Sequence, residues 1–158
     1  MKSLLLLPFF LLVSAFLEPL EARDSPLEIR LVVSPGEPGA IKRMWAEETL
    51  YCSKDAVIDA SSVAEAAVVS MAGKETTWQV EVKFSERGKA AFAEATTTHA
   101  GKQFAILSMG NIIVVARVQR PILGGLLRIS GGLTEEEARE LAASLTRTAG
   151  GKVKEEES

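Results

Sequence analysis

The chain has 158 residues, the length of a single domain, and 47% of them are hydrophobic, which is enough to build a core. Its formal net charge of −3 excludes the basic footprint that nucleic-acid binding requires, so we predict no nucleic-acid partner. A single cysteine excludes an internal disulfide bond.

The amino-terminal segment has the organisation of a secretory signal peptide. A basic start, Met1-Lys2, precedes an apolar run from Leu4 to Leu17, which is shorter than the roughly 20 residues that span a bilayer as a helix. Cleavage fits after Ala15 or after Ala22, and we favour Ala22 because Glu18-Pro19 already lies beyond the apolar run. The alternative is an uncleaved anchor. We expect a periplasmic or secreted protein with no stable membrane span after cleavage.

The first part of the mature chain is predicted to contain short strands and turns. Residues 27–33 alternate between apolar and polar side chains, which predicts a strand with one buried face. Residues 34–39 are rich in proline and glycine and predict a loop. Residues 40–48 fit either a short helix or an irregular segment. Further elements are expected as a strand at 49–52, a short helix from Asp59 to about Ala66, and a strand at 68–71 that turns at Gly73-Lys74.

The clearest pattern runs from Trp78 to Leu145. Residues 78–84 alternate strictly between apolar and polar side chains, which predicts a strand with one face toward water. Ser85 is suited to cap a helix that we predict at 86–98. Gly88 in its first turn costs on the order of 1 kcal/mol against alanine, so we expect packing to exclude a side chain there.

Two apolar runs follow this helix. Residues 104–109 and 112–118 are apolar on both faces, which predicts central strands. Gly110-Asn111 between them suits positive φ and predicts a two-residue hairpin loop. Residues 126–130 are expected to form a shorter strand.

The last predicted helix covers residues 135–148. Thr134 and Glu137 have the spacing of a capping box, which satisfies free backbone groups at a helix start. Apolar residues then recur at i, i+3, i+4 and i+7 and make one face of the helix. These residues are Ala138, Leu141, Ala142 and Leu145.

We predict the α+β class, with a single mostly antiparallel sheet and two main helices packed on one of its faces. All strands after Trp78 are expected to join that sheet. We expect a signal peptide at 1–22, one domain at 23–151, and a charged, disordered tail at 152–158.

The sequence contains no recognisable catalytic constellation. A metal site needs several ligands, and the chain has one histidine, His99, and one cysteine, Cys52, so we predict neither a metal nor a cofactor. Cys52 is expected to be a small buried residue. We therefore predict that the protein is not an enzyme. The alternative is a small secreted hydrolase in which Cys52 or a serine is exposed beside His99.

The segment 121–126 is apolar although it joins two predicted strands. Either it folds onto the core, or it offers an apolar rim to a partner. In the second case the candidate partner-binding residues are Ile122, Leu123 and Leu126. The partner would be an extended polypeptide or an envelope protein. A further alternative is a structural subunit that docks on an envelope complex through this segment.

The order of residues in the second half of the chain resembles a known family. The residues that carry the resemblance are Gly88, Phe92, Thr96, Gly101-Lys102, Ala105-Ile106, Gly110, Pro121-Ile122, Gly125, Ile129, Gly131, Leu133-Thr134-Glu135-Glu136-Glu137-Ala138 and Leu141-Ala142. Together they are similar to the head subdomain of the first large periplasmic region of SecD, part of the SecDF protein-export machinery, with the best match over 78–149. The resemblance implies a non-enzymatic exported binding module that contacts emerging or unfolded polypeptides. Two positions depart from the family pattern, because Met109 stands where we expect Asp and Ala116 where we expect Pro.

Overall fold

The computed structural model describes residues 25–71 and 77–149. The expected signal peptide, the Gly73-Lys74 turn and the expected tail lie outside the described residues. In chain order the elements are β1 Glu28–Val33, β2 Ile41–Trp45, β3 Glu48–Cys52, β4 Ile58–Asp59, the 3-10 turn η2 Ala60–Ser62, β5 Val63–Met71, β6 Thr77–Phe84, α1 Glu86–Thr98, β7 Gln103–Ser108, β8 Asn111–Arg117, β9 Leu126–Leu133 and α2 Glu135–Thr148.

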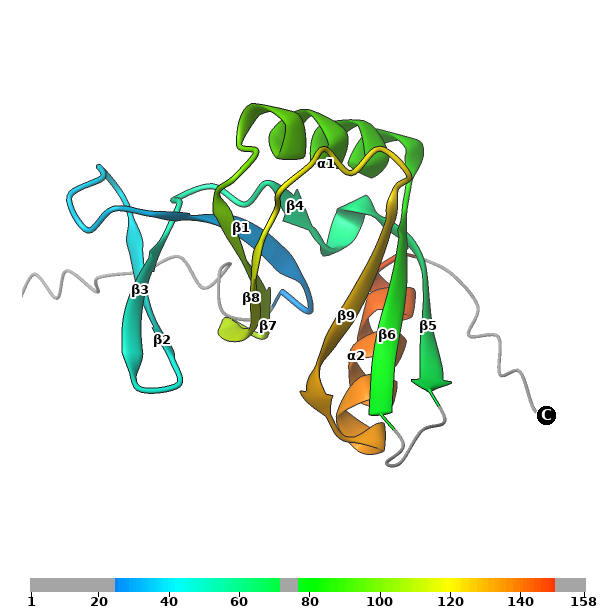
Figure 1. Cartoon of the computed structure of the whole chain (residues 1–158). Coiled ribbons are helices and arrows are strands. Elements are labelled where there is room, and N and C mark those ends of the chain that lie inside the picture. Colours follow the sequence, from blue (N-terminus) through cyan, green and yellow to red (C-terminus); the bar gives the residue numbers. More distant parts are fainter. Residues whose placement is uncertain (1–24, 72–76, 150–158) are drawn as a thin grey trace, which may run out of the picture.

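The strands form two antiparallel sheets (Figure 1). The first has the order β2-β3-β1-β7-β8, with β4 also paired to β1, and the second has the order β5-β6-β9. Helices and antiparallel strands are consistent with the predicted α+β class, but the prediction of a single sheet is wrong. The physical reason is that β7 pairs with β1, from the start of the domain, and not with β6. The strands after Trp78 are therefore divided between the two sheets.

The two helices occupy different positions. In Figure 1, α2 lies along the three-stranded sheet, whereas α1 crosses the upper ends of the strands. Accordingly, α2 contacts β5, β6 and β9, and α1 contacts β4, η2 and β6. The predicted packing of both helices on one sheet face is not confirmed. Their starts are as predicted, because Ser85 Oγ accepts from the Gly88 N–H at 3.2 Å and Thr134 forms a complete capping box with Glu137.

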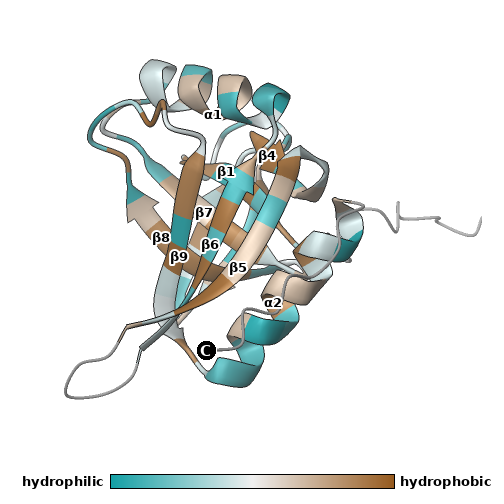
Figure 2. Ribbon diagram, turned by 90° about the vertical axis from the view of Figure 1, so that its right-hand side faces the viewer, coloured by the Kyte–Doolittle hydropathy of each residue, from teal (hydrophilic) through white to brown (hydrophobic). Residues whose placement is uncertain are grey.

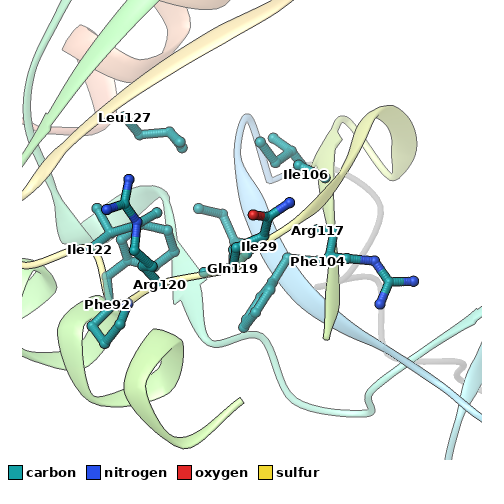
Figure 3. Close-up of a pocket in the computed structure, with 12 residues that line it drawn as sticks. Ile29, Phe92, Phe104, Ile106, Arg117, Gln119, Arg120, Ile122 and Leu127 are labelled. Carbon is teal, nitrogen blue, oxygen red and sulfur yellow. The ribbon is translucent and has the colours of Figure 1, made fainter. Parts of the chain in front are cut away.

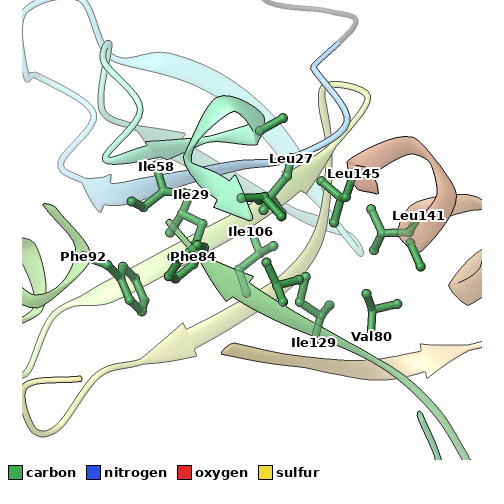
Figure 4. Packing of buried hydrophobic residues seen from close by; sticks show 14 of the residues in the cluster. Leu27, Ile29, Ile58, Val80, Phe84, Phe92, Ile106, Ile129, Leu141 and Leu145 are labelled. Atoms are coloured by element: carbon green, nitrogen blue, oxygen red, sulfur yellow. The ribbon is translucent and has the colours of Figure 1, made fainter. Parts of the chain in front are cut away.

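One large hydrophobic core lies between the sheets and the helices (Figure 4). It contains Ile29 from β1, Ile129 from β9 and Leu145 from α2, all of them buried. Burying an aliphatic side chain of this size stabilises a fold by about 1.5–3 kcal/mol. Hydrophobic and hydrophilic residues alternate along β6 (Figure 2), so one face of this strand joins the core. The two sheets therefore share their buried interior.

Residues 40–48 form neither a helix nor an irregular segment. They contain β2, which pairs antiparallel with β3 from Ile41 opposite Cys52 to Trp45 opposite Glu48. The connecting residues Ala46-Glu47 include no glycine or asparagine, although Ala46 has a φ of 51°, so no turn signal marks this hairpin in the sequence. Trp45 packs against a second, smaller core around Cys52 and Leu107, and β2 also contacts β8. The sheet β2-β3-β1-β7-β8 is therefore curved, so that its two end strands approach each other.

The β7–β8 hairpin differs by one residue from the prediction. Ser108 pairs with Asn111, so the two-residue loop is Met109-Gly110 and not Gly110-Asn111. Both loop residues have positive φ, 49° for Met109 and 78° for Gly110. The pairing register decides the loop position, and the apolar patterns of the two strands do not fix that register.

Three other expectations need correction. The helix expected from Asp59 to about Ala66 is only the short turn η2, and residues 63–71 form β5 because β6 and α2 hold this segment in the sheet. The strand expected at 126–130 extends to Leu133, since β6 continues to pair with it. Finally, β1 has both faces covered, because Glu28 and Arg30 are buried as well as the apolar residues between and beside them.

Candidate functional site

A pocket of ≈ 630 Å³ lies beneath the connection between β8 and β9. Its apolar wall combines residues from both sheets and from α1, and Figure 3 shows these side chains approaching the pocket from the separate elements. The large apolar residues include Ile29 of β1, Phe92 of α1, Phe104 and Ile106 of β7, Ile122 of the connection and Leu127 of β9. The site therefore exists only because the fold places the two sheets and α1 around one space.

The β8–β9 connection is tied to α1 at its centre. The Ile122 backbone N–H donates to Thr96 Oγ1 at 3.0 Å. Thr96 is fully buried, and its hydroxyl donates in turn to the Phe92 carbonyl at 2.7 Å. Because a buried N–H needs a partner, this chain of hydrogen bonds holds Ile122 against the helix.

Both ends of the connection are also anchored. At the β8 end, the Gly101 N–H donates to the Val118 carbonyl at 2.6 Å, and the Val118 N–H donates to the Lys102 carbonyl at 3.0 Å. At the β9 end, the Phe84 N–H donates to the Gly125 carbonyl at 2.9 Å. The pocket therefore has a roof whose backbone is held in place.

For segment 121–126 the sequence left two alternatives, burial against the core and exposure to a partner. The structure shows packing against the core for one residue and exposure for two others. Ile122 is half-buried and packs against the main core, whereas Leu123 is 64% exposed and Leu126 is 43% exposed. One side chain thus belongs to the pocket wall, and two extend the apolar surface toward solvent. Partner binding by these three residues stays a prediction.

Polar residues border the pocket at the end of β8 and on the segment that follows it. Arg117, Gln119 and Arg120 are exposed and line it, and none of the described lining residues is acidic. Arg117 Nη1 donates to the Gly101 carbonyl at 2.9 Å. Sequence reasoning missed this pocket, because its walls come from strands whose pairing it could not establish. The sequence feature that could have indicated the pocket is the pair Arg117 and Arg120, which precedes the apolar segment 121–126.

Cys52 and His99 do not support a nucleophilic site. Cys52 is fully buried in the smaller core, as predicted, and burial raises the pKa of its thiol, an effect that Arg43 and Arg30 oppose. His99 caps the end of α1, and its ring meets Phe104 edge-on with centroids 6.4 Å apart. A thiol held in its neutral form inside a core is a poor nucleophile.

Two general features of the described residues bear on function. Within 25–71 and 77–149, no three side chains of the histidine, cysteine, aspartate or glutamate type lie together in a way that could hold a metal ion. Among the helices of the same ranges, none combines the length and the apolar character needed to cross a membrane. The absence of metal and cofactor stays a prediction from the sequence.

Comparison with known proteins identifies relatives of this domain. The family model described as SecDF, P1 head subdomain, matches residues 40–149. The protein translocase subunit SecD of Acidaminococcus fermentans is 39% identical over 66 residues, which are 42% of this chain and 16% of that protein. The SecD subunit of Streptomyces coelicolor is 32% identical over 101 residues, 61% of this chain and 18% of that protein. The chain thus spans less than a fifth of either relative.

Solved structures have the same fold. A structure of SecDF, described as a membrane component that enhances protein export, superimposes with a TM-score of 0.62 at 22% identity over 82% of this chain and 64% of that one. SecDF in its super-membrane-facing form gives a TM-score of 0.60 at 24% identity over 82% of this chain and 19% of that one. The resemblance seen in the sequence is confirmed, since the family model covers more than half of the chain. The chain belongs to the SecDF P1 head subdomain family.

Proposed function

We propose that this domain binds extended segments of unfolded polypeptides outside the cytoplasmic membrane, as a non-enzymatic module of protein export. The observation that carries the proposal is the apolar pocket under the β8–β9 connection, with Leu123 and Leu126 exposed beside it. Membership in the SecDF P1 head family supports the link to export, since a related structure is described as a component that enhances this process.

The pocket has a size and composition suited to side chains of a bound polypeptide. Its volume of ≈ 630 Å³ lies within the range of about 300–1,000 Å³ that is usual for ligand pockets. Its aromatic and aliphatic wall favours one large apolar side chain. The hydrogen bond from Ile122 to Thr96 holds the pocket roof in place before a ligand binds. Binding therefore requires little rearrangement of the domain.

The exposed leucines extend the site along the chain of the ligand. A polypeptide that inserts one side chain into the pocket can place a neighbouring apolar side chain on Leu123 or Leu126. β8 and β9 are the end strands of their sheets in the described part of the chain, so backbone groups are also available for an extended segment. This combination favours extended chains over folded partners.

Neither alternative function has a comparable observation. A hydrolase would need an exposed Cys52 or serine beside His99, and the burial of Cys52 argues against the thiol version. A structural subunit would use the same leucines, but it has no need of an internal pocket. We therefore favour polypeptide binding.

The test uses a labelled peptide that carries one central Phe and neutral polar neighbours. Its binding to the purified 158-residue chain is measured. We expect the Leu123→Ser/Leu126→Ser variant to bind at least about tenfold more weakly, since the two leucines lose apolar contact area. Met44→Ser is the matched control, because Met44 is 59% exposed but lies on β2, outside the pocket lining. Equal binding by all three proteins, or no binding at any concentration, would reject the proposal.

A further inference from the structure

The charge around the pocket has one sign, opposite to that of the whole chain. The chain carries a formal net charge of −3, yet the only charged groups among the described lining residues are Arg117 and Arg120. Figure 3 shows them on two sides of the pocket, with Gln119 between them. Guanidinium groups stay protonated at any physiological pH, so this local charge is permanent.

A third cation lies at the other end of the β8–β9 connection. A Cβ added at Gly125 would lie 2.9 Å from Cγ of Lys89, so the lysine stem runs directly beside this glycine. Lys89 shares the face of α1 that carries Phe92 and Thr96, because these residues are three and seven positions further along the helix. Glu94 is two positions from Phe92 and is exposed on a different side.

The two arginines are available to a ligand. Within 25–71 and 77–149, neither guanidinium forms an ion pair with a carboxylate, in contrast to Arg128 with Glu81 and Arg139 with Glu135. Arg117 uses one Nη1 hydrogen bond for the Gly101 carbonyl, which leaves its other donors free for further contacts. A carboxylate is the group that a guanidinium binds with matching planar geometry.

From these positions we infer that the pocket selects polypeptide segments in which a large apolar side chain is flanked by acidic residues. The inference rests on the proposed polypeptide binding and adds the sequence preference of the bound segment. The apolar side chain enters the pocket at its apolar wall, and the flanking carboxylates meet Arg117 and Arg120. A basic flank meets the same cations and is repelled.

The preference is moderate in size, because the arginines are exposed. Surface ion pairs are weak individually, so we expect two of them to give about a five- to tenfold difference in Kd between acidic and neutral flanks. Salt screens exposed charges, and the difference therefore shrinks as ionic strength rises. Contact with the apolar wall has no such dependence.

The experiment compares three peptides of equal length with the same central Phe, flanked by Glu, Gln or Lys. Their Kd values for the purified 158-residue chain are measured by fluorescence anisotropy at low salt and at high salt. We expect the order Glu, Gln, Lys from tightest to weakest at low salt, and nearly equal values at high salt. Arg117→Gln/Arg120→Gln should abolish the order of the three peptides.

Controls separate this inference from the proposed function. Arg139→Gln removes one positive charge on α2, outside the pocket lining, and should keep the order of the three peptides. Arg120→Gln alone keeps the Arg117 bond to Gly101 and should give an intermediate effect. If the Gln peptide binds but the three peptides are equal, the charge preference is wrong and polypeptide binding stands. If none of the three peptides binds at any concentration, both proposals fail.

Discussion

Arg30 donates a hydrogen bond from Nε to Oε2 of Glu28 across 2.8 Å, and the two side chains are only 7% and 8% exposed. The same guanidinium donates from Nη1 to the carbonyl of Ser53 at 2.9 Å and to that of Lys54. The charged face of β1 therefore fixes the chain that leaves β3. The bonds of Arg30 to Glu28, Ser53 and Lys54 also explain why the polar face of β1 is buried.

Replacing Arg30 is expected to destabilise the domain strongly. Arg30→Met leaves the Glu28 carboxylate buried without its partner, which costs about 3–5 kcal/mol of unfolding free energy. The double variant Glu28→Gln/Arg30→Met should recover part of this loss, because no unpaired charge remains. Urea unfolding measures both, with Arg139→Ala as the exposed control, expected to cost less than about 1 kcal/mol. A small effect of Arg30→Met would contradict the buried pair.

The hydrogen bond that joins the pocket roof to α1 depends on one hydroxyl group, that of Thr96. Thr96→Val keeps the shape of a buried side chain but removes the acceptor for the Ile122 N–H, which costs about 1–3 kcal/mol. We expect faster hydrogen exchange of the Ile122 amide and weaker binding of the Phe-centred peptide. Thr97→Val is the matched control, because its hydroxyl is exposed and donates only to the Ala93 carbonyl of the same helix. Unchanged exchange at Ile122 in Thr96→Val would show that the tether is unimportant.

Gly88 is held to glycine by packing, as expected from its sequence position. A Cβ there would lie 2.5 Å from the Ser62 carbonyl oxygen and 3.2 Å from Cβ of Phe84. Gly88→Ala should therefore destabilise the domain by about 1–3 kcal/mol, although alanine is the better helix former. Thermal unfolding measures the effect. The exposed neighbour gives the comparison, since Ala90→Gly should cost about 1 kcal/mol through helix propensity alone. A stabilising Gly88→Ala would mean that α1 and η2 are not in close contact.

The β7–β8 hairpin contains a residue with a strained backbone, and a substitution can relieve that strain. Met109 has a φ of 49° and is 53% exposed, so it adopts a left-handed conformation without burying its side chain. Asparagine tolerates this region better, and Met109→Asn should stabilise the domain by about 1 kcal/mol. Gly110→Ala, at a φ of 78°, should do the opposite. Chemical denaturation of both variants checks the loop assignment, which a destabilising Met109→Asn would refute.

The capping box of α2 gives one carboxylate a pH signature. The backbone N–H and the hydroxyl of Thr134 donate to Glu137, and these bonds lower the pKa of its carboxyl from the ordinary value of 4.5. Because the folded pKa lies below the unfolded one, the stability from this group is complete above the unfolded value and is lost as pH falls through the folded value.

NMR titration of the Glu137 side chain tests this prediction directly. We expect Thr134→Val, which removes the hydroxyl, to raise the pKa of Glu137 toward its ordinary value. Identical Glu137 titration in both proteins would exclude the hydroxyl as a cause.

Local features of this fold could be read from the sequence. Ser85 and Thr134 start helices through bonds within four residues, and the alternation of β6 reports its own buried face. The pairing of β7 with β1 could not be read, because it joins residues 73 to 79 positions apart and neither strand encodes its partner. The hairpin at Ala46 was missed since its turn residues carry no turn signal.

The candidate site was predictable in one part only. Ile122, Leu123 and Leu126 were noticeable because apolar residues are unusual in a connection between strands. The wall behind them combines Phe92 of α1 with residues of four strands, β1, β7, β8 and β9, and only tertiary packing brings these together. Sequence patterns therefore indicated the rim of the pocket and not its interior.

Gly131 of β9 lies against Val114 of β8, where a Cβ would come within 3.0 Å of Cγ2 of that valine. The two strands touch there, yet in the described residues they belong to different sheets and no ladder joins them. A change in the angle between the sheets therefore breaks side-chain contacts but no backbone pairing. Such a tilt acts first on the space that the two sheets enclose, so under the proposed function the contact at Gly131 sets the width of the side chain that fits there.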